Sequence, residues 1–596
     1  MRELEHFPNL VAMFFARARE KGEAPFLWAR RDGAWRPLSW RETAEQVCSL
    51  AAGLKAIGLR PGDMVMLVSE NRPEWCIADL AIMAAGCVTV PAYTTNTERD
   101  HQHVLDDSGA RAVIVSTQKL ARPLLPAAIR SSNCEHVIGI DALPGAQAGN
   151  VEFHDWKALV AANPPDVAAC TESAAAVSRG DLACLIYTSG TGGAPRGVMQ
   201  HHGAILHNVG GCVEVISEDF GVDEEVFLSF LPPSHAYEHS GGQFFPIGIG
   251  AQIYYSEGLE KLASNIEEVR PTMMIVVPRL LEVLRQRILK NVEKQGRLAN
   301  YMMKRALEIG ARDYAGAKSL WDRPMDLVLD GLFRPKISAR FGGRVKAMVC
   351  GGAPLNPEVG IFFHSIGLTV LQGYGQTESG PVISCNRPKA GVKMDTVGPP
   401  LINTEVRIGE DGEILVRGEL VMKGYWRNPA QTEKALIDGW LHTGDVGHID
   451  EAGRIVITDR KKDLIINDKG DNVSPQKVEG MLTLQPEILQ AMVVGDRRPY
   501  LVGLLVPDPE WTAEWAAAQG KARDGSLGDD PDYHRALSGA VDRVNADLSV
   551  IEKVRRFILA DEPFSTENEQ LTPSIKIRRH VIRAAYGERL DALYKK

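Results

Sequence analysis

The sequence lacks three features that would place the protein in other classes. None of its nine cysteines forms a C-x-x-C pair, so neither a zinc site nor a disulfide framework is expected, and a reducing cytosol fits best. No run of about eighteen apolar residues occurs, so no membrane-spanning helix is expected. The first ten residues carry charge where a signal peptide has an apolar core, so we expect a cytoplasmic protein.

An excess of positive charge is also missing. The formal net charge is −9 and the isoelectric point is about 6.0, whereas general nucleic-acid binding usually needs a strongly basic domain. The hydrophobic fraction of 44% and the charged fraction of 24% are typical of a soluble globular enzyme. A chain of 596 residues exceeds one ordinary core, so at least two domains are expected.

The most informative stretch is LIYTSGTGGAPRGV at residues 185–198. An apolar run ends in a turn of glycine, serine and threonine, in which the glycines let backbone N–H groups face an anion. The hydroxyls and Arg196 add donors and charge. The patterns G-x-x-x-x-G-K-[ST] and G-x-G-x-x-G do not fit, and a flexible linker rarely follows such a strand. We therefore predict a polyphosphate-binding loop.

Helix-like and strand-like segments alternate from Leu38 onward, which favours an open α/β sheet. The candidate strands lie at 63–69, 87–90, 111–116 and 135–141. From Thr396 to Ile449 the pattern becomes β-rich, and a small mixed unit follows the charged segment that begins at Asp459. This change of pattern supports a domain boundary within residues 459–482, although a solvated run of charged residues would look similar.

Polar and small residues follow several of the predicted strands. The segment FLSFLPPSHAYEHSGG presents His235, Glu238 and His239. The H-E-x-x-H spacing is missing, so pocket lining is favoured over a metal pair. Farther along, VKAMVCGGAPLNPEV ends its strand in small residues that admit a flat ring, and TVLQGYGQTES holds a Gly-Tyr-Gly turn.

Three later segments add charge. In GWLHTGDVGHID, Asp445 lies in a glycine-flanked turn, where a carboxylate can accept both hydroxyls of a diol. In LTPSIKIRR, Lys576 has by composition the character of an ordinary exposed lysine. The basic, largely helical stretch 290–344 is either a solvated helical hairpin or a surface that touches anionic lipid.

These segments resemble, in the same order, the motifs of the adenylate-forming (AMP-binding) superfamily, in its long-chain fatty acyl-CoA synthetase branch. Residues 185–198 are similar to YTSGTTGxPKGV and depart from it at Gly192 and Arg196. The resemblance covers nearly the whole chain. It implies an α/β fold with αβ sheet layers and a β-barrel-like subdomain in residues 1–460, and a small mobile α+β domain in residues 461–596.

The resemblance also implies a role for each motif. Lys576 would reach the reacting carboxylate and the α-phosphate, Thr377 would bond the α-phosphate, and His235 would lie at the acyl site. Glu378 and Thr188 would hold Mg²⁺. The implied nucleotide-binding residues are Thr188, Ser189, Gly190, Thr191, Gly192, Gly193, Arg196, Gly351, Gly352, Ala353, Gly373, Tyr374, Gly375, Asp445 and Arg460. The implied hinge is Lys462, and the implied coenzyme A (CoA) tunnel consists of Gly470, Asp471 and Asn472.

The implied function is ATP-dependent, AMP-forming activation of a medium- or long-chain fatty acid, followed by transfer to CoA. The implied partners are therefore fatty acid, ATP, Mg²⁺ and CoA, without nucleic acid. The open alternatives are a ligase that loads a carrier protein and a non-catalytic acyl or nucleotide sensor. The motifs leave open the acyl chain length, a monomer or a homodimer, and peripheral contact with the inner face of the membrane.

Overall fold

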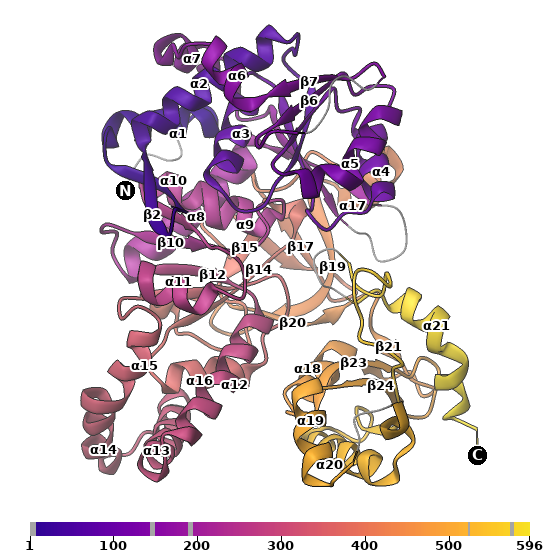
Figure 1. Ribbon diagram of the computed structural model, residues 1–596. Helices are drawn as coiled ribbons and strands as arrows, with labels where there is room; N and C mark the ends of the chain where they lie inside the picture. Colours follow the sequence, from indigo (N-terminus) through magenta and orange to yellow (C-terminus); the bar gives the residue numbers. More distant parts are fainter. Residues whose placement is uncertain (1–6, 144–148, 189–194, 522–524, 573–576, 596) are drawn as a thin grey trace.

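The computed structural model describes residues 7–143, 149–188, 195–521, 525–572 and 577–595 (Figure 1). Two large mixed sheets and a five-stranded antiparallel sheet form most of the chain, and a smaller domain follows them. Among the described residues, no helix combines the length and the apolarity that a membrane crossing requires. The predicted α/β class is thus confirmed.

The first sheet has seven strands in the order β7-β6-β5-β3-β4-β8-β9. Its pairings are parallel except for the hairpin of β8 and β9. The strands are β3 (Met64–Val68), β4 (Val88–Pro91), β5 (Ala112–Val115), β6 (His136–Gly139), β7 (Glu152–Asp155), β8 (Leu182–Thr188) and β9 (Arg196–His201). The helices around it are α1 (Leu10–Lys21), α2 (Trp40–Ala56), α3 (Pro73–Ala84), α4 (Glu98–Ser108), α5 (Gln118–Arg130), α6 (Trp156–Ala162) and α7 (Val167–Ala175).

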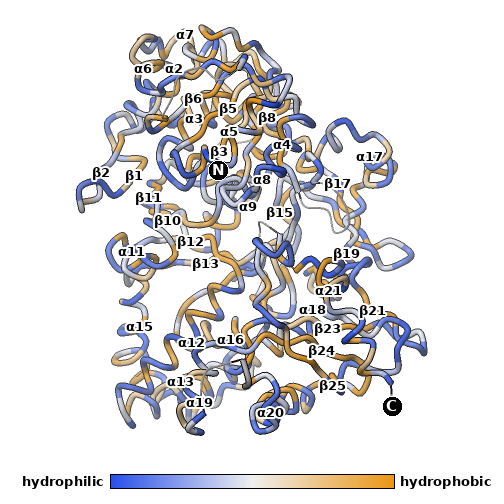
Figure 2. Tube along the Cα trace, turned by 45° about the vertical axis from the view of Figure 1, so that its right-hand side comes forward, coloured by the Kyte–Doolittle hydropathy of each residue, from blue (hydrophilic) through white to orange (hydrophobic). Residues whose placement is uncertain are grey.

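Strand β3 shows why this sheet is covered on both faces. Val65 and Leu67 belong to one hydrophobic cluster, while Met66 and Val68 belong to another. Since successive side chains of a strand point to opposite faces, an uninterrupted apolar run supplies both clusters at once. In Figure 2 the hydrophobic colour follows β3, β5 and β8. The sequence pattern of short apolar runs therefore predicted these strands correctly.

The second sheet has eight strands in the order β15-β14-β13-β12-β10-β11-β1-β2. They are β1 (Pro25–Arg31), β2 (Ala34–Ser39), β10 (Val226–Ser229), β11 (Gln252–Tyr255), β12 (Met273–Val276), β13 (Ala347–Cys350), β14 (Val370–Gly375) and β15 (Val382–Cys385). The helices near it are α8 (His202–Asp219), α9 (Ala236–Glu238), α10 (Phe245–Ile249), α11 (Leu262–Val269), α12 (Pro278–Lys294) and α16 (Pro357–Ser365). The carboxyl ends of its parallel strands lie at one edge, which is where ligands bind in α/β sheets.

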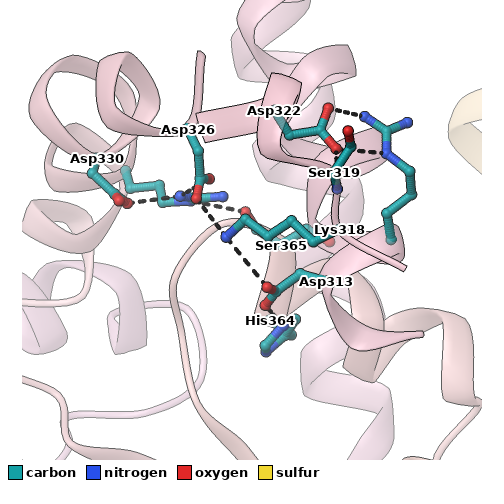
Figure 3. A network of polar contacts seen from close by, with 10 residues as sticks. Asp313, Lys318, Ser319, Asp322, Asp326, Asp330, His364 and Ser365 are labelled. Atoms are coloured by element: carbon teal, nitrogen blue, oxygen red, sulfur yellow. Dashed lines mark hydrogen bonds and ion pairs between the residues drawn. The ribbon is translucent and has the colours of Figure 1, made fainter. Parts of the chain in front are cut away.

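A helical arm, residues 297–340, is inserted between β12 and β13. It consists of α13 (Arg297–Tyr314), η3 (Leu320–Asp322), α14 (Arg323–Val328), η4 (Leu329–Phe333) and α15 (Arg334–Arg340). Figure 3 shows ion pairs that tie its turns together and join them to α16. Arg334 contacts Asp326 and Asp330 at 2.7 Å each, and its Nε donates to the carbonyl of Ser365 at 3.1 Å. The predicted helical stretch is therefore a braced hairpin.

The β-rich stretch forms the five-stranded sheet of β16 (Glu405–Ile408), β17 (Glu413–Arg417), β18 (Leu436–Ile437), β19 (Trp440–Ile449) and β20 (Ile455–Arg460), with α17 (Pro429–Ala435) beside it. The smaller C-terminal domain contains β21 (Ile465–Ile466), β22 (Asn472–Val473), β23 (Ile488–Val494), β24 (Leu501–Pro507), β25 (Val554–Leu559), α18 (Pro475–Thr483), α19 (Pro509–Ala518), α20 (Pro531–Asp547) and α21 (Arg579–Ala592). Its buried clusters consist of its own residues. The ion pair of Lys290 with Glu510, 3.0 Å, links it to α12.

Candidate active site

A cavity of about 1520 Å³ lies where the second sheet, the five-stranded sheet and the C-terminal domain meet. Pockets for one small ligand typically enclose about 300–1,000 Å³, so this cavity has room for more than one substrate. Its lining combines polar turns at the ends of strands with an apolar branch. The polar turns, the apolar branch and the residues of the C-terminal domain are three regions of one continuous site.

The predicted phosphate loop begins and ends on the cavity wall. Thr188 ends β8 and pairs with Arg196, the first residue of β9, and both line the cavity. Ser189, Gly190, Thr191, Gly192 and Gly193 lie outside the described residues. Among the residues that the structure describes, the buried Thr188 hydroxyl and the buried Arg196 Nε have no hydrogen-bond partner. Buried polar groups normally have partners, so both fit an anionic or metal-bound ligand.

Arg196 is held by residues of the segment between β17 and α17 and by α17 itself. Its guanidinium lies 4.4 Å from the centre of the Tyr425 ring, and one terminal nitrogen donates to the side-chain oxygen of Gln431 at 3.3 Å. The Tyr425 hydroxyl donates to Glu378 at 2.8 Å. Burial, and then Glu378, raise the pKa of Tyr425, so this hydroxyl stays a donor. The aromatic ring therefore connects a cation with a carboxylate, an arrangement that sequence reasoning missed.

Glu378 belongs to a single tight turn, η5 (Thr377–Ser379), that follows β14. The Gln200 amide donates to the backbone carbonyl of Thr377, which anchors the turn to β9. Glu378 and Thr188 both line the cavity. Mg²⁺ usually takes one or two protein oxygens and fills its shell with phosphate and water, so the Glu378 carboxylate and the Thr188 hydroxyl fit such an ion.

The candidate adenine slot lies at the carboxyl ends of the paired strands β13 and β14. Gly351, Gly352 and Ala353 follow β13, and Gly373, Tyr374 and Gly375 end β14. All six residues line the cavity. A Cβ atom on Gly375 would lie 1.8 Å from the carbonyl oxygen of Pro381, so only glycine fits where this strand passes β15. The close approach keeps the turn flat beside the cavity.

Asp445 is the centre of a buried polar cluster. Its strand β19 pairs with β20 so that Asp445 lies opposite Arg460, whose Nε donates to Oδ1 at 3.1 Å. The Tyr374 hydroxyl donates to Oδ2 at 2.7 Å. Burial, and then Asp445, raise the pKa of Tyr374 and keep that hydroxyl protonated. Each carboxylate oxygen has two acceptor sites, so one per oxygen is left for a diol.

Glu413 contacts the residues of β19 that flank Asp445. It is buried, and its carboxylate accepts from the backbone N–H of Gly444 at 2.7 Å and pairs with His442 at 3.1 Å. Lys461 reaches the same carboxylate at 3.5 Å. The prediction that Asp445 lies in a turn is wrong, because it lies within β19 and pairs with β20. This part of β19 is fixed to the segment just after β20.

His235 lies at the start of the apolar branch. It is half-buried, lines the cavity, and its Nδ1 accepts from the Tyr237 backbone N–H at 3.1 Å. A neutral His235 therefore carries its proton on Nε2. Apolar residues from α8, α10 and four strands form the rest of this branch. They are Cys212, Val215, Ile216, Phe245, Ile275, Val349, Leu371, Val382 and Cys385, with Leu401 beyond the last strand.

The expectation that His239 lines the pocket is wrong. Its side chain is fully buried, and its Nε2 lies 2.9 Å from Asp79 Oδ2, which also accepts from Gln243 at 2.7 Å. A buried carboxylate must be paired, and His239 fulfils that need behind the cavity wall. Neighbouring Glu238 accepts from Ser229 at 2.6 Å, and burial raises its pKa to about 8.

The C-terminal domain supplies the remaining wall. Thr572 and Ile577 line the cavity on either side of a segment that contains Lys576, which itself lies outside the described residues. Lys462 is exposed and also lines the cavity. Gly470 and Asp471 lie in the turn between β21 and β22, and Asn472 begins β22. None of the three is among the lining residues.

The chain matches the family model described as AMP-binding enzyme over residues 14–426, and that of the AMP-binding enzyme C-terminal domain over residues 462–596. It therefore belongs to the AMP-binding enzyme family. The long-chain-fatty-acid–CoA ligase FadD15 of Mycobacterium bovis is 32% identical over 99% of this chain and 97% of its own length. Human long-chain-fatty-acid–CoA ligase 6 is 30% identical over 96% of this chain and 83% of its own length.

Solved structures agree with the fold. The adenylation domain of a carboxylate reductase from Mycobacterium chelonae has a TM-score of 0.76 and 21% identity, covering 100% of this chain and 95% of that one. The anthranilate CoA ligase AuaEII has a TM-score of 0.73 and 20% identity, covering 98% of both chains. The predicted superfamily and its fold are confirmed.

Proposed function

We propose that this chain joins a fatty acid to CoA, consuming ATP and releasing AMP and pyrophosphate. The observation that carries the proposal is the single cavity, which holds Arg196 and Glu378 at a polar end and an apolar branch beside His235. One site of this kind receives both a nucleotide and an alkyl chain. Full-length relatives that are named as long-chain-fatty-acid–CoA ligases support the same assignment.

In the first half-reaction, a carboxylate oxygen of the acid forms a bond to the α-phosphorus of ATP. The bond from that phosphorus to the bridging oxygen breaks, and pyrophosphate leaves. Two anions must meet, so the protein contributes mainly positioning and charge neutralisation. Arg196 faces the leaving pyrophosphate, and Thr377 donates to the α-phosphate. Mg²⁺, held by Glu378 and Thr188, supplies further positive charge at the phosphates when it is bound.

The nucleoside is oriented by residues that are already in place. Asp445 and Arg460 bind the ribose hydroxyls, and Tyr374 packs beside the adenine with its hydroxyl fixed by Asp445. Because Asp445 is buried and held by Tyr374 and Arg460, it can accept the diol without reorganising β19. His235 orients the carboxylate of the acid from the opposite end.

In the second half-reaction, the CoA sulfur forms a bond to the acyl carbonyl carbon, the carbon–oxygen bond to AMP breaks, and AMP leaves. We propose that residues 461–596 form a mobile domain on residues 1–460. In one arrangement this domain brings Lys576 to the carboxylate. In another, rotated about Lys462, it brings Gly470, Asp471 and Asn472 to the CoA path.

A product assay tests the function. Oleate, ATP, Mg²⁺ and CoA should yield AMP, pyrophosphate and oleoyl-CoA in equal amounts. Accumulation of acyl-adenylate with CoA as the only thiol would indicate a carrier-protein ligase instead. Absence of pyrophosphate release with oleate and with decanoate would indicate a non-catalytic homologue.

We further propose that the apolar branch sets a preference for long acyl chains. Cys212 lies on α8 and forms part of this branch. Cys212→Trp should lower kcat/KM for oleate by about tenfold to 100-fold, because the indole occupies volume that the distal methylene groups need. Hexanoate should retain most of its activity. A panel from acetate to oleate, assayed by thioester formation, measures the change.

The matched control is Ser217→Trp, which adds the same indole to the exposed side of α8. It should leave the whole substrate panel unchanged. An equal loss for hexanoate and oleate in Cys212→Trp would contradict the assignment of this branch to the distal chain.

We also propose that the arm, residues 297–340, contacts an anionic lipid surface. It exposes large apolar side chains, with Trp321 at 92% exposure. The others are Leu298, Tyr301, Leu320, Leu327, Val328 and Leu332. All four of its aspartates pair with basic residues of the arm or its neighbours. Within the described residues, no ion pair involves Arg297, Lys304, Arg323 or Lys336, so the outward charge is basic.

Sedimentation with vesicles tests this contact. The double variant Leu320→Ser, Trp321→Ser should weaken binding to phosphatidylglycerol-containing vesicles by about tenfold or more, because two apolar anchors are lost. Leu259→Ser removes an apolar side chain, 67% exposed, outside the arm and should bind like the wild type. Equal binding of all three proteins, or none by the wild type, would contradict the proposal.

A further inference from the structure

A cluster of three ligating side chains lies at the edge of the seven-stranded sheet. His136 is on β6, and Glu152 and His154 are on the edge strand β7. The register pairs His136 with Glu152, and Glu152 and His154 are two residues apart, so all three side chains share one face. None of them lines the cavity of the candidate active site. This cluster is therefore a separate feature of the molecule.

One ligating atom from each of these three side chains belongs to a compact triangle. His136 Nδ1 lies 3.1 Å from His154 Nε2, and Glu152 Oε2 lies 3.6 Å from the first nitrogen and 3.8 Å from the second. Ligands about 2.0–2.1 Å from a tetrahedral zinc ion are separated by about 3.3–3.4 Å. The three observed separations bracket that value. One ion can therefore contact all three atoms with small side-chain adjustments.

The surroundings prepare His136 as a metal ligand. Its other nitrogen, Nε2, lies 3.9 Å from the carboxylate of Glu135, which Arg111 holds in an ion pair. A carboxylate on that side favours the proton on Nε2 and leaves the lone pair of Nδ1 facing the triangle. Burial, and then His154, lower the pKa of His136, which also favours the neutral ring. Glu135 thus places a negative charge on the side of His136 that faces away from the triangle.

We propose that His136, Glu152 and His154 form a zinc site that fastens the edge strand β7 to β6. Two imidazoles and one carboxylate suit Zn²⁺, whereas Mg²⁺ and Ca²⁺ prefer oxygen ligands. His136 is buried, His154 is half-buried and Glu152 is exposed, so the fourth position faces solvent. Cysteine pairs and the H-E-x-x-H spacing are patterns of residues that lie close together along the chain. This site is formed by strand pairing, which neither pattern detects.

Zinc binding to the full-length protein tests the proposal, after chelation and in millimolar Mg²⁺ that saturates the predicted magnesium site. The wild type should bind one Zn²⁺ per chain by elemental analysis and calorimetry, and zinc should raise its Tm. Glu152→Gln and His154→Gln should each weaken the affinity by about 100-fold or more and abolish the rise in Tm. Co²⁺ should give visible absorption bands in the wild type that are lost in both variants.

The matched control is His364→Gln, which removes a histidine that faces one carboxylate, Asp313, at 3.2 Å. It should bind zinc like the wild type. Glu152 is exposed, so Glu152→Gln should have the Tm of the metal-free wild type, and its fold is then not in question. Zinc binding that survives in both ligand variants, or a wild type that binds no zinc at micromolar concentration, would overturn the proposal.

Discussion

Lys576→Ala is expected to slow acyl-adenylate formation by about 10²–10³-fold while leaving the conversion of supplied acyl-adenylate to acyl-CoA nearly intact. Removing one preorganised donor from developing charge typically has an effect of this size. The proposed role concerns only the first half-reaction, in which two anions approach each other. The described neighbours Thr572 and Ile577 line the cavity, which supports a position for Lys576 at the reacting groups.

Two separate assays measure this asymmetry. Pyrophosphate release with oleate and ATP reports the first step, and thioester formation from synthetic oleoyl-adenylate and CoA reports the second. Lys595→Ala removes an exposed lysine near the end of the same domain and should leave both rates unchanged. An equal loss of both rates in Lys576→Ala would contradict the assigned role.

The order of the strands and the turns that follow them could be predicted from the sequence because both depend on local patterns. A short apolar run such as Met64–Val68, followed by turn residues, is typical of a strand that is covered on both faces. Turns after such strands gather at one edge of a parallel sheet. Thr188 ends such a strand and Glu378 follows one, whereas Asp445 lies in the antiparallel strand β19. The resemblance of their motifs placed the three residues in one site, and all three line one cavity.

Interactions between distant segments could not be predicted in this way. His235 and His239 have equivalent places in the sequence pattern, yet Asp79 on α3 draws His239 behind the cavity wall. Tyr425 joins Arg196 to Glu378 although these residues lie far apart along the chain. Such partners are selected by tertiary packing and by the cost of leaving a buried charge unpaired, and one sequence does not encode them locally.

The arrangement of the C-terminal domain leaves the proposed CoA path away from the cavity. In the present arrangement, Thr572 and Ile577 line the cavity, whereas the turn that contains Gly470 does not. If Gly470, Asp471 and Asn472 guide CoA, this domain must rotate between the half-reactions. Lys461 is anchored, since its N–H donates to the carbonyl of Gly444 at 2.9 Å and its Nζ pairs with Glu413. Lys462, the next residue, is exposed and is our proposed pivot.

Lys462→Pro is therefore expected to slow thioester formation by about 100-fold while adenylation stays within about threefold of the wild type. Proline fixes φ near −65° and so restricts the torsion change that the rotation needs. Among the described backbone hydrogen bonds, none uses the N–H of Lys462, so proline removes no such bond in this arrangement. The two half-reaction assays used for Lys576 measure both rates on the same preparation.

Lys462→Ala is the matched control, because it removes the same charge and leaves φ unrestricted. It should form thioester at nearly the wild-type rate. If Lys462→Ala slows thioester formation as much as Lys462→Pro does, the charge of Lys462 matters and the freedom of its φ torsion does not. If proline leaves the second step unchanged, rotation about this residue is excluded. Slow thioester formation in Lys462→Pro but not in Lys462→Ala would support a conformational change between the two chemical steps, because both variants lose the same lysine side chain and differ in the freedom of φ.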